Sequence, residues 1–366
     1  MSKGVTILLL GATLLAGAVW AAMGDWSSFR GNAALTGTVS TAFTDRPRLL
    51  WTYETKEPIV ATAAIVGDTA YVATRGKKLS ALRLADGRPK WTFASSDFIS
   101  ASPCVTGGSV YVGDESGIFY AVNAATGKLR WKLTTSDKIM SSATPVPGGV
   151  LFGSYDNYLY KLSTVGKLIW KFRSEAQVHG TPCVGGGTVI IAGCDGYVRM
   201  IDLKSGKQRA AAKLESNFGA SPVYANGVAF VGSMGGDCAA VSVKDGKLLW
   251  HTYVSKDQGG FYGSPALTSD SLIFPSRAKS VVRLARGTGK LVWTFPLRGE
   301  CDSSPVVAGG RAYFGADDGN VYELDVATGR KVWQYRAGSL ITAGPALGRD
   351  RMVISTSDGA VLCFGR

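Results

Sequence analysis

The sequence is poor in histidine and charge, and it lacks the short motifs that usually announce catalysis. Only His179 and His251 occur among 366 residues, at non-equivalent places, and charged residues make up 18% of the chain. Two histidines so placed argue against a histidine metal centre, and no zinc-ligand spacing, phosphate loop or nucleophile elbow is present. No long helical periodicity is found either. We therefore predict no catalytic residue and no metal site.

The cysteines limit which disulfides and which lipid attachment can be expected. The chain has six cysteines, no two adjacent, and the first is Cys104. Six cysteines allow many disulfide pairings and the spacing selects none of them, so we expect buried free thiols. Because no cysteine precedes Cys104, we expect no lipid attachment near the N-terminus.

One apolar run stands at the N-terminus. Lys3 is followed by apolar residues 5–15 and then by small residues through Ala22, which are the three parts of a secretory signal peptide. We predict that residues 1–22 are a cleaved signal peptide and that the protein is periplasmic or secreted. The run is shorter than the ~20 apolar residues that span a bilayer, although an uncleaved anchor is an alternative. Residues 23–47 follow as a leader segment.

Tryptophan marks a repeat along almost the whole chain. The segment 124–131, which contains Thr126-Gly127-Lys128, recurs in variant form. The repeat tryptophans, separated by 40, 40, 39, 80, 43 and 40 residues, are Trp51, Trp91, Trp131, Trp170, Trp250, Trp293 and Trp333. The interval of 80 covers two periods, with Ala210 in place of an eighth tryptophan. Eight repeats with this period predict one closed domain.

Each repeat contains four short β segments, here named A to D. In the repeat that ends near Trp131 they are residues 102–105, 109–112, 117–122 and 128–133, separated by glycine-containing turns. Turns of this kind supply positive φ and join antiparallel strands. Radial repetition of such sheets is the β-propeller. We therefore predict an all-β, eight-bladed β-propeller of four-stranded antiparallel blades over residues 48–366.

The ends of the repeat array predict how the ring closes. The last repeat supplies only three strands, at 342–347, 351–356 and 360–364. Residues 48–53 have the signature of strand D but no preceding strand to pair with. We predict that this N-terminal strand completes the last blade.

Proline and tryptophan indicate the inner and outer strands. Proline opens strand A in six repeats, at Pro103, Pro182, Pro222, Pro265, Pro305 and Pro345, and Ala63 and Ala143 take its place in two others. Only an edge strand tolerates proline, so strand A is expected to lie innermost, with its unpaired side facing the tunnel. The tryptophan of strand D is expected to dock on the neighbouring blade, and Ala210 to leave blade 4 less firmly held.

The repeat resembles the quinoprotein-type (PQQ-like) propeller repeat. Residues 123–131 and 325–333 carry its Thr-Gly-Lys or Thr-Gly-Arg turn and its tryptophan, and weaker copies cover residues 48–366. The family includes calcium-dependent quinoprotein dehydrogenases and the BamB-type propellers of outer-membrane-protein assembly. The sequence is similar to the assembly propellers in length, blade count and its ending at 357–362. It has none of the vicinal cysteines or calcium ligands that the resemblance to dehydrogenases would imply.

Two features depart from the assembly propellers. The lipid-bearing cysteine is missing, and the loops before 181–182 and 221–222 lack the arginine and aspartate cluster that the resemblance implies for docking. Residues 24–32 also look like the leader of exported quinoprotein-like repeat proteins of unassigned role.

The repeat places a cation at the same turn position in seven blades, and we call these residues the basic ring. The residue after Thr-Gly, or its equivalent, is cationic in seven repeats: Arg88, Lys128, Lys167, Lys207, Lys247, Lys290 and Arg330. All C-to-D turns lie on one face of a propeller, whereas the B-to-C turns of the opposite face are mostly acidic here. With a net charge of +13, the ring predicts weak contact with anionic membrane or glycan surfaces, and turn propensity is the alternative explanation. We expect no nucleic-acid binding, because aromatics are not interleaved with these cations.

Blade 6 departs from the repeat on the D-to-A side. Its loop between Trp250 and Pro265 is three residues longer than the others, and its B-to-C turn carries cations. Aromatic and arginine side chains are frequent at interface hot spots, so we predict a docking site that comprises Phe261, Tyr262, Arg277 and Lys279, with His179 as a polar rim residue. The alternative is that Phe261 repeats an apolar residue that seals the blades.

Together these observations predict a non-catalytic exported scaffold. Its partners are expected to be envelope proteins, bound by a monomer within a larger complex, and the resemblance implies outer-membrane protein assembly. The alternatives are a PQQ-dependent oxidoreductase or quinone-binding protein, and a glycan-binding propeller. We expect no cofactor, because no quinone or calcium ligand set is evident.

Overall fold

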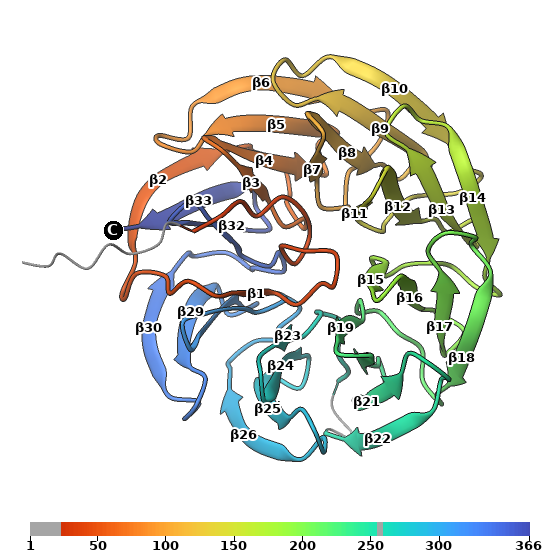
Figure 1. Cartoon of the computed structure of the whole chain (residues 1–366). Coiled ribbons are helices and arrows are strands. Elements are labelled where there is room, and N and C mark those ends of the chain that lie inside the picture. The colour runs from red at the N-terminus through yellow and green to blue at the C-terminus, as the bar shows by residue number, and fades with distance from the viewer. Residues whose placement is uncertain (1–22, 255–258) are drawn as a thin grey trace, which may run out of the picture.

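A computed structural model describes residues 23–254 and 259–366, in which all regular elements are β-strands. Eight sheets are arranged radially around a central axis (Figure 1). No helix in these two ranges is long and apolar enough to cross a membrane. The predicted signal peptide, residues 1–22, lies outside the described residues.

The strands repeat in the order A to D. The inner A strands are β3 (Ala64–Val66), β7 (Cys104–Thr106), β11 (Thr144–Val146), β15 (Cys183–Gly185), β19 (Val223–Ala225), β23 (Ala266–Leu267), β27 (Val306–Ala308) and β31 (Ala346–Gly348). The B strands are β4 (Thr69–Thr74), β8 (Ser109–Gly113), β12 (Gly149–Gly153), β16 (Thr188–Ala192), β20 (Val228–Gly232), β24 (Ser271–Ser276), β28 (Arg311–Gly315) and β32 (Arg351–Ser355).

The outer half of each blade follows the same order. The C strands are β5 (Lys78–Arg83), β9 (Ile118–Asn123), β13 (Tyr158–Ser163), β17 (Tyr197–Asp202), β21 (Asp237–Ser242), β25 (Ser280–Ala285), β29 (Asn320–Asp325) and β33 (Ala360–Gly365). The D strands are β6 (Pro89–Ala94), β10 (Leu129–Thr134), β14 (Leu168–Arg173), β18 (Gln208–Lys213), β22 (Leu248–Tyr253), β26 (Leu291–Pro296), β30 (Lys331–Arg336) and β2 (Arg48–Glu54).

Hydrogen bonding confirms the predicted eight-bladed propeller. Each sheet pairs A with B, B with C and C with D, as in β3-β4-β5-β6. The A strands lie nearest the axis and the D strands form the outer rim (Figure 1). This strand order puts the D-to-A and B-to-C turns on one face, the D–A face. It puts the A-to-B and C-to-D turns on the other, the C–D face.

The ring closes as predicted. Strand β2 pairs antiparallel with β33, so that Arg48 lies opposite Gly365, Trp51 opposite Cys363 and Glu54 opposite Ala360. Blade 8 therefore combines one N-terminal strand with three C-terminal strands. Hydrogen bonds between the two ends of the chain hold the first and last repeats together.

The leader is part of the propeller, which the repeat pattern did not indicate. Its backbone crosses the C–D end of the tunnel and bonds to the inner edge of seven blades, with partners at Ile65, Val105, Val184, Tyr224, Leu267, Val307 and Arg349. A short strand, β1 (Thr38–Val39), also pairs parallel with β27. The expectation that the inner edge of strand A is unpaired is therefore wrong at this end of the tunnel. The A strands expose unused N–H groups there, and the leader carbonyls accept from them.

Tryptophan docking on the next blade is confirmed. The indole Nε1 donates to a main-chain oxygen of the next C-to-D turn at 2.9 to 3.2 Å in Trp51, Trp91, Trp131, Trp170, Trp250 and Trp293. The ring lies flat on the glycine of that turn. A Cβ atom on Gly206, for example, would lie 2.7 Å from the Trp170 ring. Glycine at this position therefore admits the indole that joins two blades.

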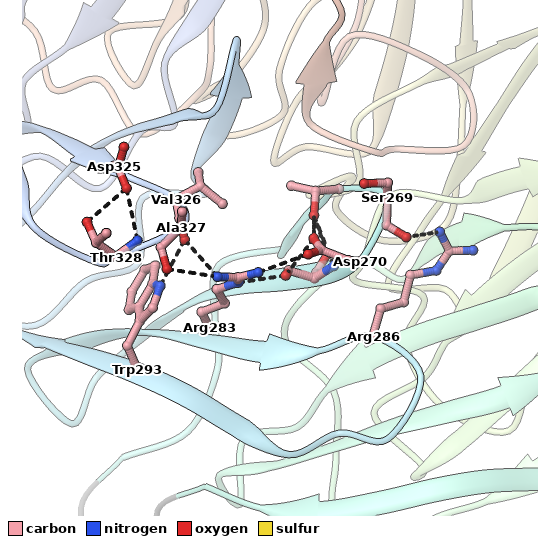
Figure 2. Close-up of polar contacts among 11 residues, drawn as sticks. Ser269, Asp270, Arg283, Arg286, Trp293, Asp325, Val326, Ala327 and Thr328 are labelled. Carbon is pink, nitrogen blue, oxygen red and sulfur yellow. Dashed lines mark hydrogen bonds and ion pairs between the residues drawn. The ribbon is translucent and has the colours of Figure 1, made fainter.

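The junction of blades 6 and 7 adds an arginine to the same arrangement (Figure 2). Trp293 Nε1 donates to the Val326 carbonyl at 2.9 Å, and Arg283 Nη1 donates to the Val326 and Ala327 carbonyls at 3.2 and 3.0 Å. The other arm of the guanidinium bonds to the Asp270 carboxylate at 3.0 Å. Both side chains of blade 6 thus hold the C-to-D turn of blade 7.

Blade 4 shows what replaces the indole. With alanine at position 210, the turn of blade 5 approaches the D strand directly, and a Cβ on Gly246 would lie 2.7 Å from the Ala211 carbonyl oxygen. Main-chain contact therefore fills the space that a ring occupies elsewhere. All six cysteines are free, five of them buried, as expected.

We predict that Trp170→Ala lowers the free energy of unfolding by about 2 to 4 kcal/mol, because it removes a large packed ring and a hydrogen bond between blades. Urea denaturation followed by fluorescence of the remaining tryptophans measures the change. The control is Ile169→Ala on the same strand, whose side chain is 47% exposed and whose loss should cost less than about 0.5 kcal/mol. Equal losses in the two variants would contradict the docking role.

Candidate functional site: the tunnel mouth

The open end of the tunnel lies on the D–A face and is built from one position of each repeat. The residue three places before the proline position lines a cavity of about 580 Å³ in all eight blades. These mouth residues are Val60, Ser100, Met140, His179, Gly219, Tyr262, Asp302 and Thr342. One backbone position thus presents eight different side chains to a single concavity, which is the usual form of a binding site on a rigid scaffold.

A ring of hydroxyl groups lies deeper in the tunnel. The residue just before each proline position is serine or threonine in seven blades. In six of them its oxygen accepts a hydrogen bond from the main-chain N–H of the equivalent residue in the preceding blade. Six such bonds, of 2.8 to 3.3 Å, run in sequence through Thr62, Ser102, Ser142, Thr181, Ser221, Ser264 and Ser304. The series stops at Gly344, which has no side chain to continue it. These bonds fix the A strands relative to one another.

The leader forms the floor of the tunnel. Phe29 lines the deeper chamber, together with the hydroxyl ring. Close to it, Arg30 is 2% exposed, has a φ of 62° and donates from Nη2 to the Pro265 carbonyl at 2.8 Å. Burial lowers the pKa of Arg30 to about 9. The leader therefore blocks the C–D end and leaves the mouth as the accessible end.

His179 is one side chain of the mouth, as predicted. Its Nδ1 lies 2.6 Å from the Tyr155 hydroxyl, and Lys138 Nζ lies 4.6 Å from the centre of the Tyr155 ring. Burial, aided by the nearby Lys138 charge, lowers the pKa of His179 below its usual value. The imidazole is therefore neutral at physiological pH.

Tyr262 and Arg277 contact each other at the mouth. The Arg277 guanidinium carbon lies 3.4 Å from the centre of the Tyr262 ring. The same guanidinium binds both oxygens of Asp302 at 2.9 and 2.6 Å, and Glu300 lies 3.6 Å away. A two-point arginine–carboxylate bond and a cation–π contact hold both side chains in one conformation.

Two of the predicted docking residues lie elsewhere. Phe261 is fully buried against Phe274, with ring centres 5.0 Å apart, so its expected role in contact with a partner needs correction. It occupies the sealing position that Ile139 and Phe218 occupy in other blades. Lys279 is exposed on the B-to-C turn and does not line the mouth. Part of the lengthened loop, residues 255–258, lies outside the described residues.

A group of acids lies beside Arg277. Burial, together with the Asp302 and Glu300 carboxylates, raises the pKa of Asp317 to about 6. Asp317 Oδ1 is buried without a hydrogen-bond partner in the described ranges. This carboxyl group therefore takes up a proton far more readily than an exposed aspartate does.

The acids of the B-to-C turns are used within their own turns. The fully buried Asp114 accepts from the Ile118 N–H at 2.9 Å and from the Tyr120 hydroxyl at 2.8 Å. Asp156 and Asp318 bind a tyrosine hydroxyl in the same way. These carboxylates are thus held by hydrogen bonds within their own turns. The basic-ring residues, in contrast, are all exposed on C-to-D turns.

Sequence reasoning missed Tyr155 and Asp302 as residues of the mouth. Aligning the repeats on the proline position would have identified Asp302, since every mouth residue lies three places before it. Tyr155 belongs to a B-to-C turn and has no such marker. Only the fold shows that its hydroxyl reaches His179.

The mouth residues do not fit a planar quinone held by a metal ion. The Tyr262 ring is covered by Arg277 at 3.4 Å. No cysteine forms a disulfide, and the described residues contain no group of three or more His, Cys, Asp or Glu side chains placed to hold a metal ion. No catalytic step through such a group follows from these residues.

The repeat turns, the docked tryptophans and the radial sheets define a PQQ-like repeat propeller. Within that class, the family model of the outer membrane protein assembly factor BamB matches residues 36–147, 120–264 and 258–365, so the chain belongs to this family.

Curated relatives agree over part of their length. The outer membrane protein assembly factor BamB of Burkholderia pseudomallei is 26% identical over 188 residues, which are 46% of this chain and 48% of the relative. That of Legionella pneumophila is 23% identical over 195 residues, half of each chain. The matches therefore span about half the length of these relatives.

Solved structures share the fold. BamB from Moraxella catarrhalis superposes with a TM-score of 0.75 at 19% identity and covers 87% of this chain and 98% of its own. A europium-containing methanol dehydrogenase gives 0.81 at 14% identity and covers 94% and 98%. At such identities the likeness concerns the propeller architecture alone.

We predict that Asp317→Asn raises the melting temperature at pH 8 but not at pH 4. The raised pKa means that the folded state resists ionisation of Asp317. Stability is therefore lost as pH rises from about 4 to about 6, and the loss persists above this range. Thermal denaturation at both pH values measures the effect. The control is Asp318→Ala, which removes the acceptor for the Tyr322 hydroxyl and should destabilise at pH 8. Stabilisation by Asp317→Asn that is the same at both pH values would contradict the assignment.

Proposed function

We propose that the protein is an exported, non-catalytic scaffold that acts in outer-membrane protein assembly by binding an envelope protein at the tunnel mouth. The observation that carries the proposal is the family match, which extends from residue 36 to residue 365. The signal-like residues 1–22 support export to the periplasm. The tunnel contributes a second argument, because the leader closes one end and leaves a single rigid concavity.

The mouth has the chemistry of a protein-binding surface. Tyr262 and Arg277 are residue types that dominate interface energies, and their mutual contact orders them before a partner arrives. Met140 and Met234 add flexible apolar surface on the lining of the same cavity. A cavity of about 580 Å³ accommodates one or a few side chains inserted by a partner. Extended contacts on the surrounding D-to-A loops would complete the interface.

We predict that Tyr262→Ala and Arg277→Glu each reduce capture of the envelope partner at least fivefold, the change expected for loss of about 1 kcal/mol or more at an interface hot spot. Crosslinking in intact envelopes, followed by purification and identification of the crosslinked protein, measures capture. Arg277→Lys is the conservative comparison, because it keeps the charge but loses the two-point bond to Asp302.

The control is Lys128→Glu, an equal reversal of charge on the C–D face. All variants are compared at matched thermal stability. Capture by both mouth variants at the level of the unaltered protein would place the docking site elsewhere. Dye reduction with added quinone and calcium, using alcohols and aldoses, tests the enzymatic alternative. Sustained turnover there would overturn the non-catalytic assignment.

A further inference from the structure

The large apolar side chains that remain exposed are concentrated on one rim. Among the described residues fourteen are exposed, and ten of these lie in a C-to-D turn or in the first three residues of a D strand. The ten are Leu49, Leu50, Leu129, Val165, Leu168, Ile169, Leu248, Leu249, Leu291 and Val292. Scattered exposed leucines are ordinary, but a concentration on one rim of one face is not.

The same rim carries cations that are free to bind an external anion. Within the described ranges no ion pair involves the basic-ring residues Lys128, Lys167, Lys207, Lys290 or Arg330, whereas Arg88 and Lys247 have aspartate neighbours at 3.7 Å. Other arginines of this face are used internally. Arg283 holds Asp270 and the next turn, and Arg286 donates to the Ser269 carbonyl (Figure 2). Five of the seven basic-ring cations therefore have no ion-pair partner among the described residues.

Cations and aliphatic side chains alternate closely along the rim. On blade 3, Lys167 is followed by Leu168 and Ile169, which are 50% and 47% exposed. On blade 5, Lys247 is followed by Leu248 and Leu249, which are 49% and 54% exposed. Blades 2 and 6 repeat the pattern with Lys128-Leu129 and Lys290-Leu291-Val292. Two such patches, on blades 2–3 and 5–6, lie on well-separated sectors of the ring, so that a flat surface touches both.

The chain also enters the described structure on this face. The Met23 N–H donates to Asp350 Oδ1 at 3.3 Å, and the Gly24 carbonyl accepts from the Arg349 N–H at 3.0 Å. Both partners belong to the A-to-B turn of blade 8, which projects from the C–D face. The first described residues of the leader therefore lie on the same side as the basic ring.

We propose that the C–D face docks on an anionic phospholipid surface. The basic ring contacts lipid phosphates, and the exposed aliphatic residues of the D-strand starts enter the interfacial region. The tunnel mouth then faces away from the bilayer and stays open to a protein partner. This inference goes beyond the proposed function, because it concerns the opposite face and does not depend on which protein is bound.

The test is co-sedimentation of the exported protein with vesicles of phosphatidylethanolamine and phosphatidylglycerol, compared with vesicles of neutral phosphatidylcholine. We expect binding to the anionic vesicles only, weakening as salt shortens the screening length from about 10 Å at 0.1 M to about 3 Å at 1 M. Reversal of three cations in Lys128→Glu, Lys167→Glu, Lys207→Glu should weaken binding at least about tenfold. The pair Leu248→Ser, Leu249→Ser should weaken it several-fold without changing the salt dependence.

The matched control is Lys77→Glu, Lys78→Glu, Lys279→Glu, which changes the net charge equally on the D–A face and should bind nearly as well as the unaltered protein. Loss of binding in this control equal to that of the C–D variant would show that only net charge matters, and would overturn the proposal. Equal binding to neutral vesicles, or binding to lipopolysaccharide micelles but not to phospholipid, would overturn it as well. The C–D variants should still capture the envelope partner, so failure here is distinguishable from failure of the proposed function.

Discussion

The pairing of β2 with β33 is the constraint on which the rest of the structure depends. A closed ring of blades has no first or last blade, and each blade holds its neighbour by a side chain that reaches forward to the next turn. Such an arrangement is complete only when the last blade meets the first. The antiparallel pairing of β2 with β33, which places Trp51 opposite Cys363, makes this connection. The Trp51 indole then continues the forward contact by bonding to Leu84 of blade 1.

Because the propeller is closed, two layers of side chains line the tunnel, the hydroxyl ring and the mouth residues. Once eight equivalent strands surround one axis, any backbone position becomes a layer of eight side chains. The layer before the prolines is almost uniformly serine or threonine and holds the strands together through six hydrogen bonds. The layer two residues earlier ranges from Gly219 to Tyr262. Stability and the proposed recognition thus use different layers of one repeated framework.

The sequence was a good guide wherever a residue repeats. Tryptophan spacing, the turn glycines and the three-stranded last repeat were sufficient for the blade count, the strand order and the closing strand. The leader was not predicted to block the tunnel because residues 23–47 have no internal period, and most of its main-chain hydrogen bonds are accepted by carbonyls that any sequence provides. Phe261 was placed on the surface because it lies in the lengthened loop, next to Tyr262. The structure aligns it with Ile99, and a single residue separates the sealing position from the mouth.

The position of the leader has a consequence for the order in which the protein folds. Met23 bonds to Asp350, 327 residues away, and the leader touches the inner edge of seven blades. The first residues of the domain to be synthesised are therefore among the last to find their partners, and contacts of such sequence separation form slowly. Until blade 8 emerges, the apolar side chains Met23, Trp26 and Phe43 have no complete binding surface. Protection of this N-terminal segment from premature association is thus a requirement of the topology itself.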